Sequence, residues 1–322
     1  MSQAESPHAS MNGAYFAMIA VFCFSLNDVL VKSLSSTYAL HQIVLFRSLV
    51  ALALVLLAVG LFGNGLSSLK TKRLGGHLLR GAFVVAANMA FFLGLAAMPL
   101  AEAVAIFFVS PLIITVFSVI FLGETVGPRR WIAIAVGFIG VLVIMRPGTA
   151  AFEPASILPI IAALCYAGLH MMTRRLGTTE SAQSLVFYIQ LLFIVVTLTI
   201  GLAVGDGRFA DQEDPSLAFF FREWIWPRPE DLMTLLAIGF ILFGGAYFIS
   251  QAYRVSEAAI VAPFEYIAMP LSIFWGIVIF NEWPDGWSWA GMALIIGSGL
   301  FLLWREHRVG QDTAASGPKY RR

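Results

Sequence analysis

The chain has 322 residues, of which 59% are hydrophobic and 12% are charged, and its formal net charge is +1. A typical soluble domain has roughly 45–50% apolar and about 25% charged residues, so this composition excludes an ordinary soluble fold and indicates a lipid bilayer as the surroundings. The small net charge and the lack of a basic stripe argue against a nucleic-acid partner. We therefore expect an all-α integral membrane protein.

Apolar segments of membrane length follow one another along the chain. A spanning helix needs about 20 mainly apolar residues, and the short connectors between most segments make neighbouring helices antiparallel. The predicted spans are residues 12–34, 39–62, 76–97, 102–122, 130–146, 155–173, 183–204, 231–253, 257–280 and 287–304. The ends, residues 1–11 and 305–322, are predicted to be polar tails.

The two halves of the chain repeat one pattern of polar residues. The first predicted span carries Cys23, Asp28 and Lys32, and the sixth carries Cys165, His170 and Arg174 with the same spacing. Further on, Glu102 is answered by Glu257, and Glu124 is answered by Glu282. Five helices per half is an odd number, so the second half must enter the membrane from the opposite side. We predict two inverted repeats, residues 12–146 and 155–304.

Basic residues are unequally divided between the two sides of the predicted membrane. With the N-terminus inside, the outer connectors hold only Arg146, Arg208, Arg222 and Arg228, and the other basic residues outside the spans fall on the inner side. Positive charges favour the cytoplasmic side. We therefore expect both tails in the cytoplasm and the protein in the cell (inner) membrane.

One connector, residues 205–230, is longer than the others. It begins with acidic and glycine-rich sequence and continues into the apolar, aromatic stretch 217–226. Because tryptophan favours the headgroup level, we expect an interfacial half-helix there on the outer face. A regulatory lid is the alternative.

Several short motifs resemble the drug/metabolite transporter superfamily, in its EamA-type branch of ten-helix carriers. They are Asn27-Asp28-Val-Leu-Val-Lys32, Phe46-Arg47, Leu79-Arg80-Gly81, Pro111, Leu122-Gly123-Glu124, Ala262-Pro263-Phe264-Glu265-Tyr266 and Phe280-Asn281-Glu282-Trp283-Pro284. The resemblance covers the chain from about Gly13 to Trp304, and within the superfamily it is strongest to carriers of the S-adenosylmethionine type. It implies ten helices around a central cavity, built from two inverted five-helix repeats.

Charged residues inside spans are costly, by about 2.5–3.5 kcal/mol even on insertion scales, so each is a functional candidate. Asp28 and Lys32 lie four residues apart on one helix face and can pair, either as mutual neutralisation near the outer mouth or in a gating or substrate role. His170, the counterpart of Asp28 in the second repeat, could exchange protons near neutral pH or serve as a structural hydrogen-bonding group.

Arg47 and Glu265 each lie about eight residues inside their spans, from opposite sides, which is about 12 Å deep at 1.5 Å per residue. In a core about 30 Å thick they would reach similar depths. They could pair with each other structurally, or bind the carboxylate and amine of a zwitterionic solute. Glu265 occupies roughly the repeat position of Ser110, which makes the two halves chemically unequal there.

Uncharged polar residues inside the spans could line the cavity as hydrogen-bonding groups, or bond neighbouring helices. They are Asn88, Tyr166, Tyr188, Gln190, Tyr247, Gln251 and Tyr266. Glu102 and Glu257 are expected to offset helix dipoles at the starts of their helices. Pro111, Pro263 and Pro270 interrupt backbone bonding and mark the mobile helices.

These features together predict a secondary active or facilitative transporter of a small organic metabolite, amino-acid-like or nucleoside-like and amphoteric, that works by alternating access. No Gly-x-x-x-x-Gly-Lys-[Ser/Thr] motif for ATP occurs, and no catalytic residue, cofactor or metal site is predicted. The alternative is a membrane-embedded lipid-modifying enzyme or a channel. The solute, the direction of transport, proton coupling and the choice between monomer and homodimer stay open.

Overall fold

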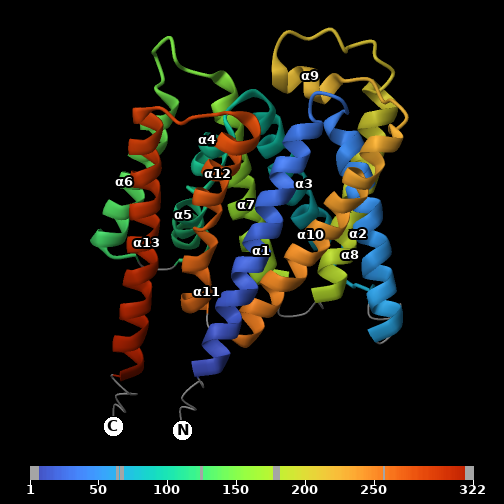
Figure 1. Cartoon of the computed structure of the whole chain (residues 1–322). Coiled ribbons are helices and arrows are strands. Elements are labelled where there is room, and N and C mark those ends of the chain that lie inside the picture. Colours follow the sequence, from blue (N-terminus) through green and yellow to red (C-terminus); the bar gives the residue numbers. More distant parts are fainter. Residues whose placement is uncertain are drawn as a thin grey trace.

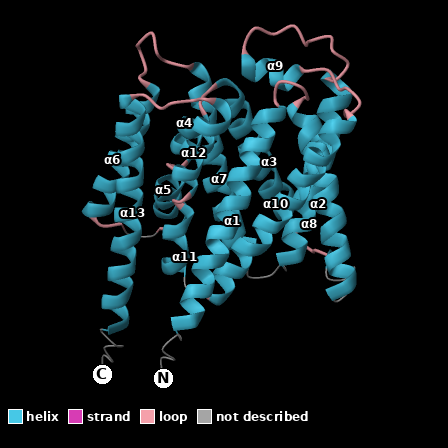
Figure 2. Cartoon of the chain, viewed as in Figure 1, coloured by secondary structure: helices cyan, strands magenta, loops and turns pink. Residues whose placement is uncertain are grey.

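Helices account for all regular secondary structure in the described part of the chain (Figure 2). The computed structural model describes residues 7–62, 65, 69–123, 126–176, 182–256 and 258–315. Within these ranges, ten helical segments are long and apolar enough to cross a membrane. The prediction of an all-α protein with ten membrane spans is confirmed.

The ten spans divide evenly between the two halves. The first half contains α1 (Pro7–Leu34), α2 (Leu40–Phe62), α3 (Leu74–Ala97), α4 (Leu100–Phe107), α5 (Ser110–Leu122) and α6 (Pro128–Met145). The second half contains η2 (Pro154–Ser156), α7 (Ile157–Leu176), α8 (Ala182–Val204), α9 (Pro215–Phe221), α10 (Pro229–Val255), α11 (Ala258–Glu265), α12 (Ala268–Phe280) and α13 (Gly286–Ala315). Helix α1 begins and α13 ends on one face, here called the terminal face, and α9 lies on the opposite face, here called the loop face (Figure 1).

Two of the predicted spans, 102–122 and 257–280, are broken near their middles instead of being continuous helices. The chain turns at Phe108–Val109 between α4 and α5, and at Tyr266–Ile267 between α11 and α12. Proline has no N–H, so Pro111 cannot bond the carbonyl of Phe107, and Pro270 cannot bond that of Tyr266. Pro263, in contrast, lies inside α11 without ending it.

The two halves pack against each other in repeat-related pairs. Helix α1 packs on α10, and its counterpart α7 packs on α3; α2 packs on its own counterpart α8, and α6 on α13. Figure 1 shows the α6–α13 pair at one side of the bundle. Each half thus buries its apolar surface against the other half, so neither repeat forms a complete core by itself.

The long connector is fixed to the loop-face end of α2. Trp224 Nε1 donates to His41 Nδ1 (2.5 Å), and His41 Nε2 is 2.9 Å from the Phe220 carbonyl oxygen. Gln42 Nε2 donates to the Ile225 carbonyl (2.6 Å). The expected helix over 217–226 is correct only in part: α9 ends at Phe221, because the following residues are extended and packed onto α2 and α8.

The α6–α13 crossing depends on two glycines. A Cβ placed on Gly140 would lie 2.8 Å from the Gly291 carbonyl oxygen, closer than side-chain carbons approach backbone. Small residues at such crossings allow close helix packing in membranes.

Replacing Gly140 with alanine should therefore destabilise the protein, by about 1–3 kcal/mol as for other overpacked cores. The measurement is thermal unfolding of purified protein in detergent. Gly297→Ala is the matched control, because no atom lies within 4 Å of a Cβ at that position of α13. Equal melting temperatures for both variants would contradict the packing argument.

Candidate functional site

The two helix breaks meet in the middle of the bundle. The rings of Phe108 and Tyr266, which hold the same position in the two breaks, lie 5.2 Å apart. Two equivalent residues of an inverted repeat can touch only where the pseudo-twofold axis passes between them. Discontinuous helices at such an interface are where secondary transporters place their substrate and ion sites.

The residues that end the first half-helices differ in chemistry. Phe107 ends α4 and Glu265 ends α11, so Phe107 and not Ser110 is the structural counterpart of Glu265. The sequence-based match of Glu265 to Ser110 was wrong, because Glu257 and Glu282 lie three residues further apart than Glu102 and Glu124 do. One side of the axis therefore carries an aromatic ring where the other carries a carboxylate.

Two tyrosines surround this carboxylate. Tyr166 of α7 lies 5.3 Å from the ring of Phe107 and interacts electrostatically with Glu265, as does Tyr266. The Tyr266 ring lies against α13 at Gly299, where a Cβ would overlap its hydroxyl. The predicted candidates Glu265, Tyr166 and Tyr266 are thus brought together at the axis.

Arg47 occupies a different place. Its side chain is 1% exposed, and its Nη2 donates to Asn88 Oδ1 of α3 at 2.7 Å. The guanidinium carbon lies 5.6 Å from the Phe92 ring and 5.5 Å from the Phe193 ring, within cation–π range. Asp28 is the carboxylate that acts electrostatically on it.

The expected pair between Arg47 and Glu265 is therefore wrong in this structure. Among the described residues, the only hydrogen-bond partner of Arg47 is Asn88. The depth estimate placed both groups near the midplane but said nothing of their lateral positions. Arg47 points from α2 towards α3 and α8, whereas Glu265 lies beside α7.

Asp28 and Lys32 do not pair either, although they share a helix face. Asp28 accepts a hydrogen bond from Asn27 Nδ2 (3.1 Å), whereas Lys32 Nζ reaches Glu282 Oε1 (2.6 Å) and the Met98 carbonyl (2.7 Å). Lys32 lies one turn nearer the loop face, where the α12–α13 connector supplies the carboxylate of Glu282. An ion pair across helices thus replaces the expected pair along one helix.

Glu282 joins the two repeats. Its Oε1 pairs with Lys32, and its Oε2 accepts the backbone N–H of Leu100 (2.8 Å), the first residue of α4. The residue before this helix is Pro99, which provides no side-chain cap, so a glutamate from the other repeat satisfies the exposed helix end. Sequence reasoning treated Glu282 only as a marker of the fold.

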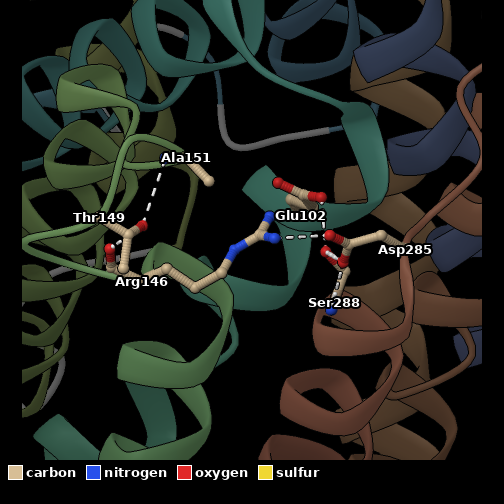
Figure 3. A network of polar contacts seen from close by, with 6 residues as sticks. All are labelled: Glu102, Arg146, Thr149, Ala151, Asp285 and Ser288. Atoms are coloured by element: carbon tan, nitrogen blue, oxygen red, sulfur yellow. Dashed lines mark hydrogen bonds and ion pairs between the residues drawn. The ribbon is translucent and has the colours of Figure 1, made fainter.

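A second polar network lies beside it on the loop face (Figure 3). Arg146 Nη1 donates to Asp285 Oδ2 at 2.6 Å, and Ser288 Oγ donates to Glu102 Oε1 at 2.6 Å. Asp285 also caps α13 by accepting the Ser288 N–H (2.8 Å). Glu102 lies in the first turn of α4, where it was expected, and additionally ties that turn to α13.

His170 lies on the terminal-face side of the site. Its ring packs edge-on against Tyr166 at 4.5 Å, and Arg80 of α3 acts on it electrostatically. Arg80 Nε donates to Thr173 Oγ1 (2.8 Å) and its Nη1 to the Leu185 carbonyl (3.1 Å). Arg80 was noted only as part of a motif, yet it is a third cation inside the bundle.

The remaining polar candidates are placed as follows. Gln190 is buried on α8, and the Tyr188 ring packs 4.5 Å from His77. Tyr247 is about half exposed and packs on Phe248, and Gln251 is half-buried one turn further along α10. The Glu124, Glu257 and Arg174 side chains lie outside the described part of the structure. Within that part, no group of three or more His, Cys, Asp and Glu residues could hold a metal ion.

Comparison with known proteins places this architecture in context. The model of the EamA-like transporter family matches residues 11–146 and again residues 154–304. A riboflavin transporter of Rhizobium johnstonii is 30% identical over 95% of this chain and 96% of its own length. An S-adenosylmethionine uptake transporter of Rickettsia prowazekii is 28% identical, covering 92% and 94% of the two chains. A solved crystal structure with 18% identity and a TM-score of 0.62, covering 92% of this chain and 98% of that one, shares the fold.

The Lys32–Glu282 pair should contribute measurably to stability. Its side chains are 10% and 23% exposed, so a coupling of about 2 kcal/mol is expected, between the ~0–1 kcal/mol of exposed pairs and the ~3–5 kcal/mol lost when a buried pair is broken. A double-mutant cycle with Lys32→Met and Glu282→Gln measures it through unfolding in mixed micelles. The exposed Arg228–Glu230 pair serves as the control, and a Lys32–Glu282 coupling no larger than that of the control would refute the assignment.

The contacts of the Asp285 carboxylate predict that the stability of the protein depends on pH. The Ser288 N–H holds the pKa of the Asp285 carboxyl below its usual value, with Arg146 adding to the effect. A carboxyl group whose pKa is lower in the folded than in the unfolded protein stabilises the fold at pH values above its unfolded pKa. This contribution to stability is lost as the pH falls through the folded pKa. The melting temperature of Asp285→Asn should lie below that of the wild type at pH 7, and the difference should shrink below about pH 4. A difference that does not change with pH would exclude the ionised carboxylate as its source.

Proposed function

The chain belongs to the EamA-like transporter family and is a small-molecule transporter, and we propose that it moves an amphoteric metabolite by alternating access. The observation that carries this proposal is the meeting of two helix breaks, with Glu265 at one break and Phe107 at the other. An aromatic ring and a carboxylate at one point suit a solute that has a planar or apolar part and a cationic or hydrogen-bond-donating part. Amino-acid-like and nucleoside-like metabolites have this chemistry.

We assign the solute site to two groups of residues. Glu265, Tyr166 and Tyr266 lie at the axis, Arg47 and Asn88 lie together towards the loop face, and Gln190 lies in the terminal-face half of α8. Tyr188, Tyr247 and Gln251 remain further proposed contacts, reached as the helices move. Asp28, Lys32 and His170 are assigned to gating or coupling, with Lys32 acting through Glu282.

Alternating access requires one face to be closed while the other is open. The loop-face contacts support a closed loop face: Lys32, Glu282 and Leu100 join α1, α12 and α4, and Arg146 with Asp285 joins α6 to α13. These contacts cross between the repeats, so they must separate when one repeat rocks against the other. The breaks after Phe107 and Glu265 give α4 and α11 the freedom to move.

We further propose that the terminal face is cytoplasmic and that the protein lies in the cell (inner) membrane. Support comes from the basic residues, most of which fall in terminal-face connectors and tails. The two repeats, 12–146 and 155–304, would then be exposed alternately to the two compartments.

Solute flux tests this function directly. Proteoliposomes that contain only the purified protein should accumulate a labelled metabolite by exchange, with riboflavin, S-adenosylmethionine and amino acids as the first panel. A lipid-modifying enzyme would leave the solutes where they began, and a channel would equilibrate them without counterflow. Either result would reject alternating-access transport.

If Glu265 couples transport to protons, its loss should affect gradient-driven accumulation and exchange differently. Because its counterpart is Phe107, Glu265 is the proton-binding group that only one repeat supplies at the axis, and its solvation would change as α11 moves. Glu265→Gln should abolish accumulation driven by an imposed pH gradient, yet retain exchange of solute for solute.

The exposed Glu230→Gln is the matched control for this measurement. Asp28→Asn and His170→Gln, measured in the same way, show whether either of these two acid–base groups is also needed for gradient-driven accumulation. A wild type that ignores the gradient would identify a uniporter or exchanger.

A further inference from the structure

Arg80 is a cation inside α3 that the described residues neither neutralise nor enclose. Its Nε donates to Thr173 Oγ1 (2.8 Å) and its Nη1 to the Leu185 carbonyl (3.1 Å), and both acceptors are uncharged. A guanidinium has five N–H groups, so three remain, two of them on Nη2. Nη2 makes no hydrogen bond to the described residues and is open to solvent. A charge kept inside a span without a counter-charge indicates a functional site.

Lys32 and Arg47 are not available to a ligand in the same way. Arg47 is 1% exposed and lies between two phenylalanine rings, 5.6 and 5.5 Å from its guanidinium carbon. Lys32 is engaged by Glu282 on the loop face, at 2.6 Å. Arg80 is only half-buried and lies on the terminal-face side, which the proposed cycle leaves accessible while the loop face is closed. An anion that enters from the terminal face can therefore reach Arg80 without breaking an ion pair.

Arg80 lies on the face of α3 that is directed towards the axis. Eleven residues, about three helical turns, separate it from Phe91, so the two side chains leave α3 in nearly the same direction. The ring of Phe91 packs 5.2 Å from that of Phe107, which ends α4 at the helix break. The contact fixes the direction of Phe91. Arg80 shares that direction and lies nearer the terminal face.

The facing surface of α7 carries a matching row of side chains. Tyr166, His170 and Thr173 are spaced as i, i+4 and i+7, which places them on one helix face. The Tyr166 ring lies 5.3 Å from Phe107 and 4.5 Å from His170. The Thr173 hydroxyl donates to a carbonyl of α7 (2.8 Å), so its oxygen is free to accept from Arg80 Nε. Helices α3 and α7 thus meet along one seam, with aromatic rings at the axis and Arg80 at the other end.

The two ends of this seam differ in chemistry and lie well apart. Seven residues separate Tyr166 from Thr173, a rise of about 10 Å at 1.5 Å per residue. The axis end offers the Phe107 ring, a tyrosine and the carboxylate of Glu265, which ends α11 at the second break. The terminal-face end offers the N–H groups of Arg80. A solute that uses both ends has a planar, hydrogen-bond-donating end and, about 10 Å away, a group that matches a guanidinium.

An anion is the group that Arg80 matches best. The planar fork of a guanidinium binds two oxygens of a carboxylate or phosphate at once, and such charge-assisted hydrogen bonds are stronger than neutral ones. An uncharged carbonyl would accept a hydrogen bond but would leave the positive charge uncompensated. Inside a bundle, where the effective dielectric constant is low, that compensation matters more than it does in water.

We propose that Arg80, held by Thr173, forms the anion subsite of this transporter and binds the carboxylate or phosphate of a solute whose planar end lies against Phe107 and Tyr166. The inference rests on the transport function proposed above, and it narrows the solute class to elongated metabolites with an anionic end. Arg80 contacts the anion. Thr173 is a positioning residue, which fixes the direction of the guanidinium.

Binding to the purified full-length protein in lipid nanodiscs tests the subsite. Two pairs of probes differ by one anionic group: S-adenosylmethionine with its decarboxylated form, and riboflavin 5′-phosphate with riboflavin. In at least one pair the anionic member should bind about tenfold more tightly or better, as expected for charge-assisted hydrogen bonds. Preference in the first pair identifies a carboxylate, and preference in the second a phosphate. If the anionic member is preferred in neither pair, including the case in which no probe binds, the proposal is overturned.

Variants assign the preference to the guanidinium. Arg80→Gln should bring the affinity ratio of the pair to about one, whereas Arg80→Lys, which keeps the charge but not the fork, should retain part of the preference. Thr173→Val should weaken binding of the anionic member by a smaller factor and leave that of its neutral partner unchanged. Arg208→Gln, at an exposed loop arginine, is the matched control and should not change the ratio.

The outcomes distinguish the subsite from the transport function. A ratio unchanged in Arg80→Gln would refute the subsite; if that variant does not fold, ratios unchanged in both Arg80→Lys and Thr173→Val would refute it. Solute exchange in proteoliposomes without any preference for the anionic probes would refute the subsite and leave the transporter intact. A preference that Arg80→Gln abolishes, with no flux for any solute of the panel, would support the anion subsite and reject the transport function.

Discussion

The need to bond every backbone polar group inside the membrane governs this structure. Hydrocarbon offers no hydrogen bonds, so a broken helix is tolerated only where protein surrounds the break. Pro111 and Pro270 each remove the hydrogen bond that would continue a helix, and the bundle places both interruptions at its centre, where the rings of Phe108 and Tyr266 touch. The contact between these repeat-related rings locates the pseudo-twofold axis, and with it the proposed site.

The charges inside the bundle follow from the same requirement. Three described cations inside the bundle meet acceptors from other segments: Lys32 meets Glu282, Arg47 meets Asn88, and Arg80 meets Thr173 and the Leu185 carbonyl. Glu282 does two things at once, since it neutralises Lys32 and caps the first residue of α4. The Lys32–Glu282 contact joins the two repeats at the loop face, whereas the Arg47–Asn88 contact joins α2 and α3 of one repeat.

Asymmetry between otherwise similar halves gives the site its chemistry. The repeats agree in helix order, in the break and in the packing of counterpart helices. They differ where Glu265 faces Phe107 and where Arg47 has no basic counterpart on α8. Two identical halves would place the same side chains on both sides of the axis. Binding of a particular solute or proton instead requires particular groups. We therefore assign the proposed site to the few positions at which the two halves differ.

Length, apolarity and the repeated polar pattern were sufficient to predict ten spans and two related halves, and the resemblance of the short motifs indicated the transporter family, because each depends on local sequence and on order along the chain. The same sequence identified Arg47, Asp28, Lys32 and Glu265 as costly charges inside the membrane. It could not assign their partners, since depth within a span says nothing about which neighbouring helix a side chain faces. Helix packing alone decided that Lys32 pairs with Glu282 and not with Asp28, that Arg47 bonds Asn88 and not Glu265, and that Phe107 is the structural counterpart of Glu265. The sequence does not specify which faces of the helices meet, so only the tertiary structure identifies these partners.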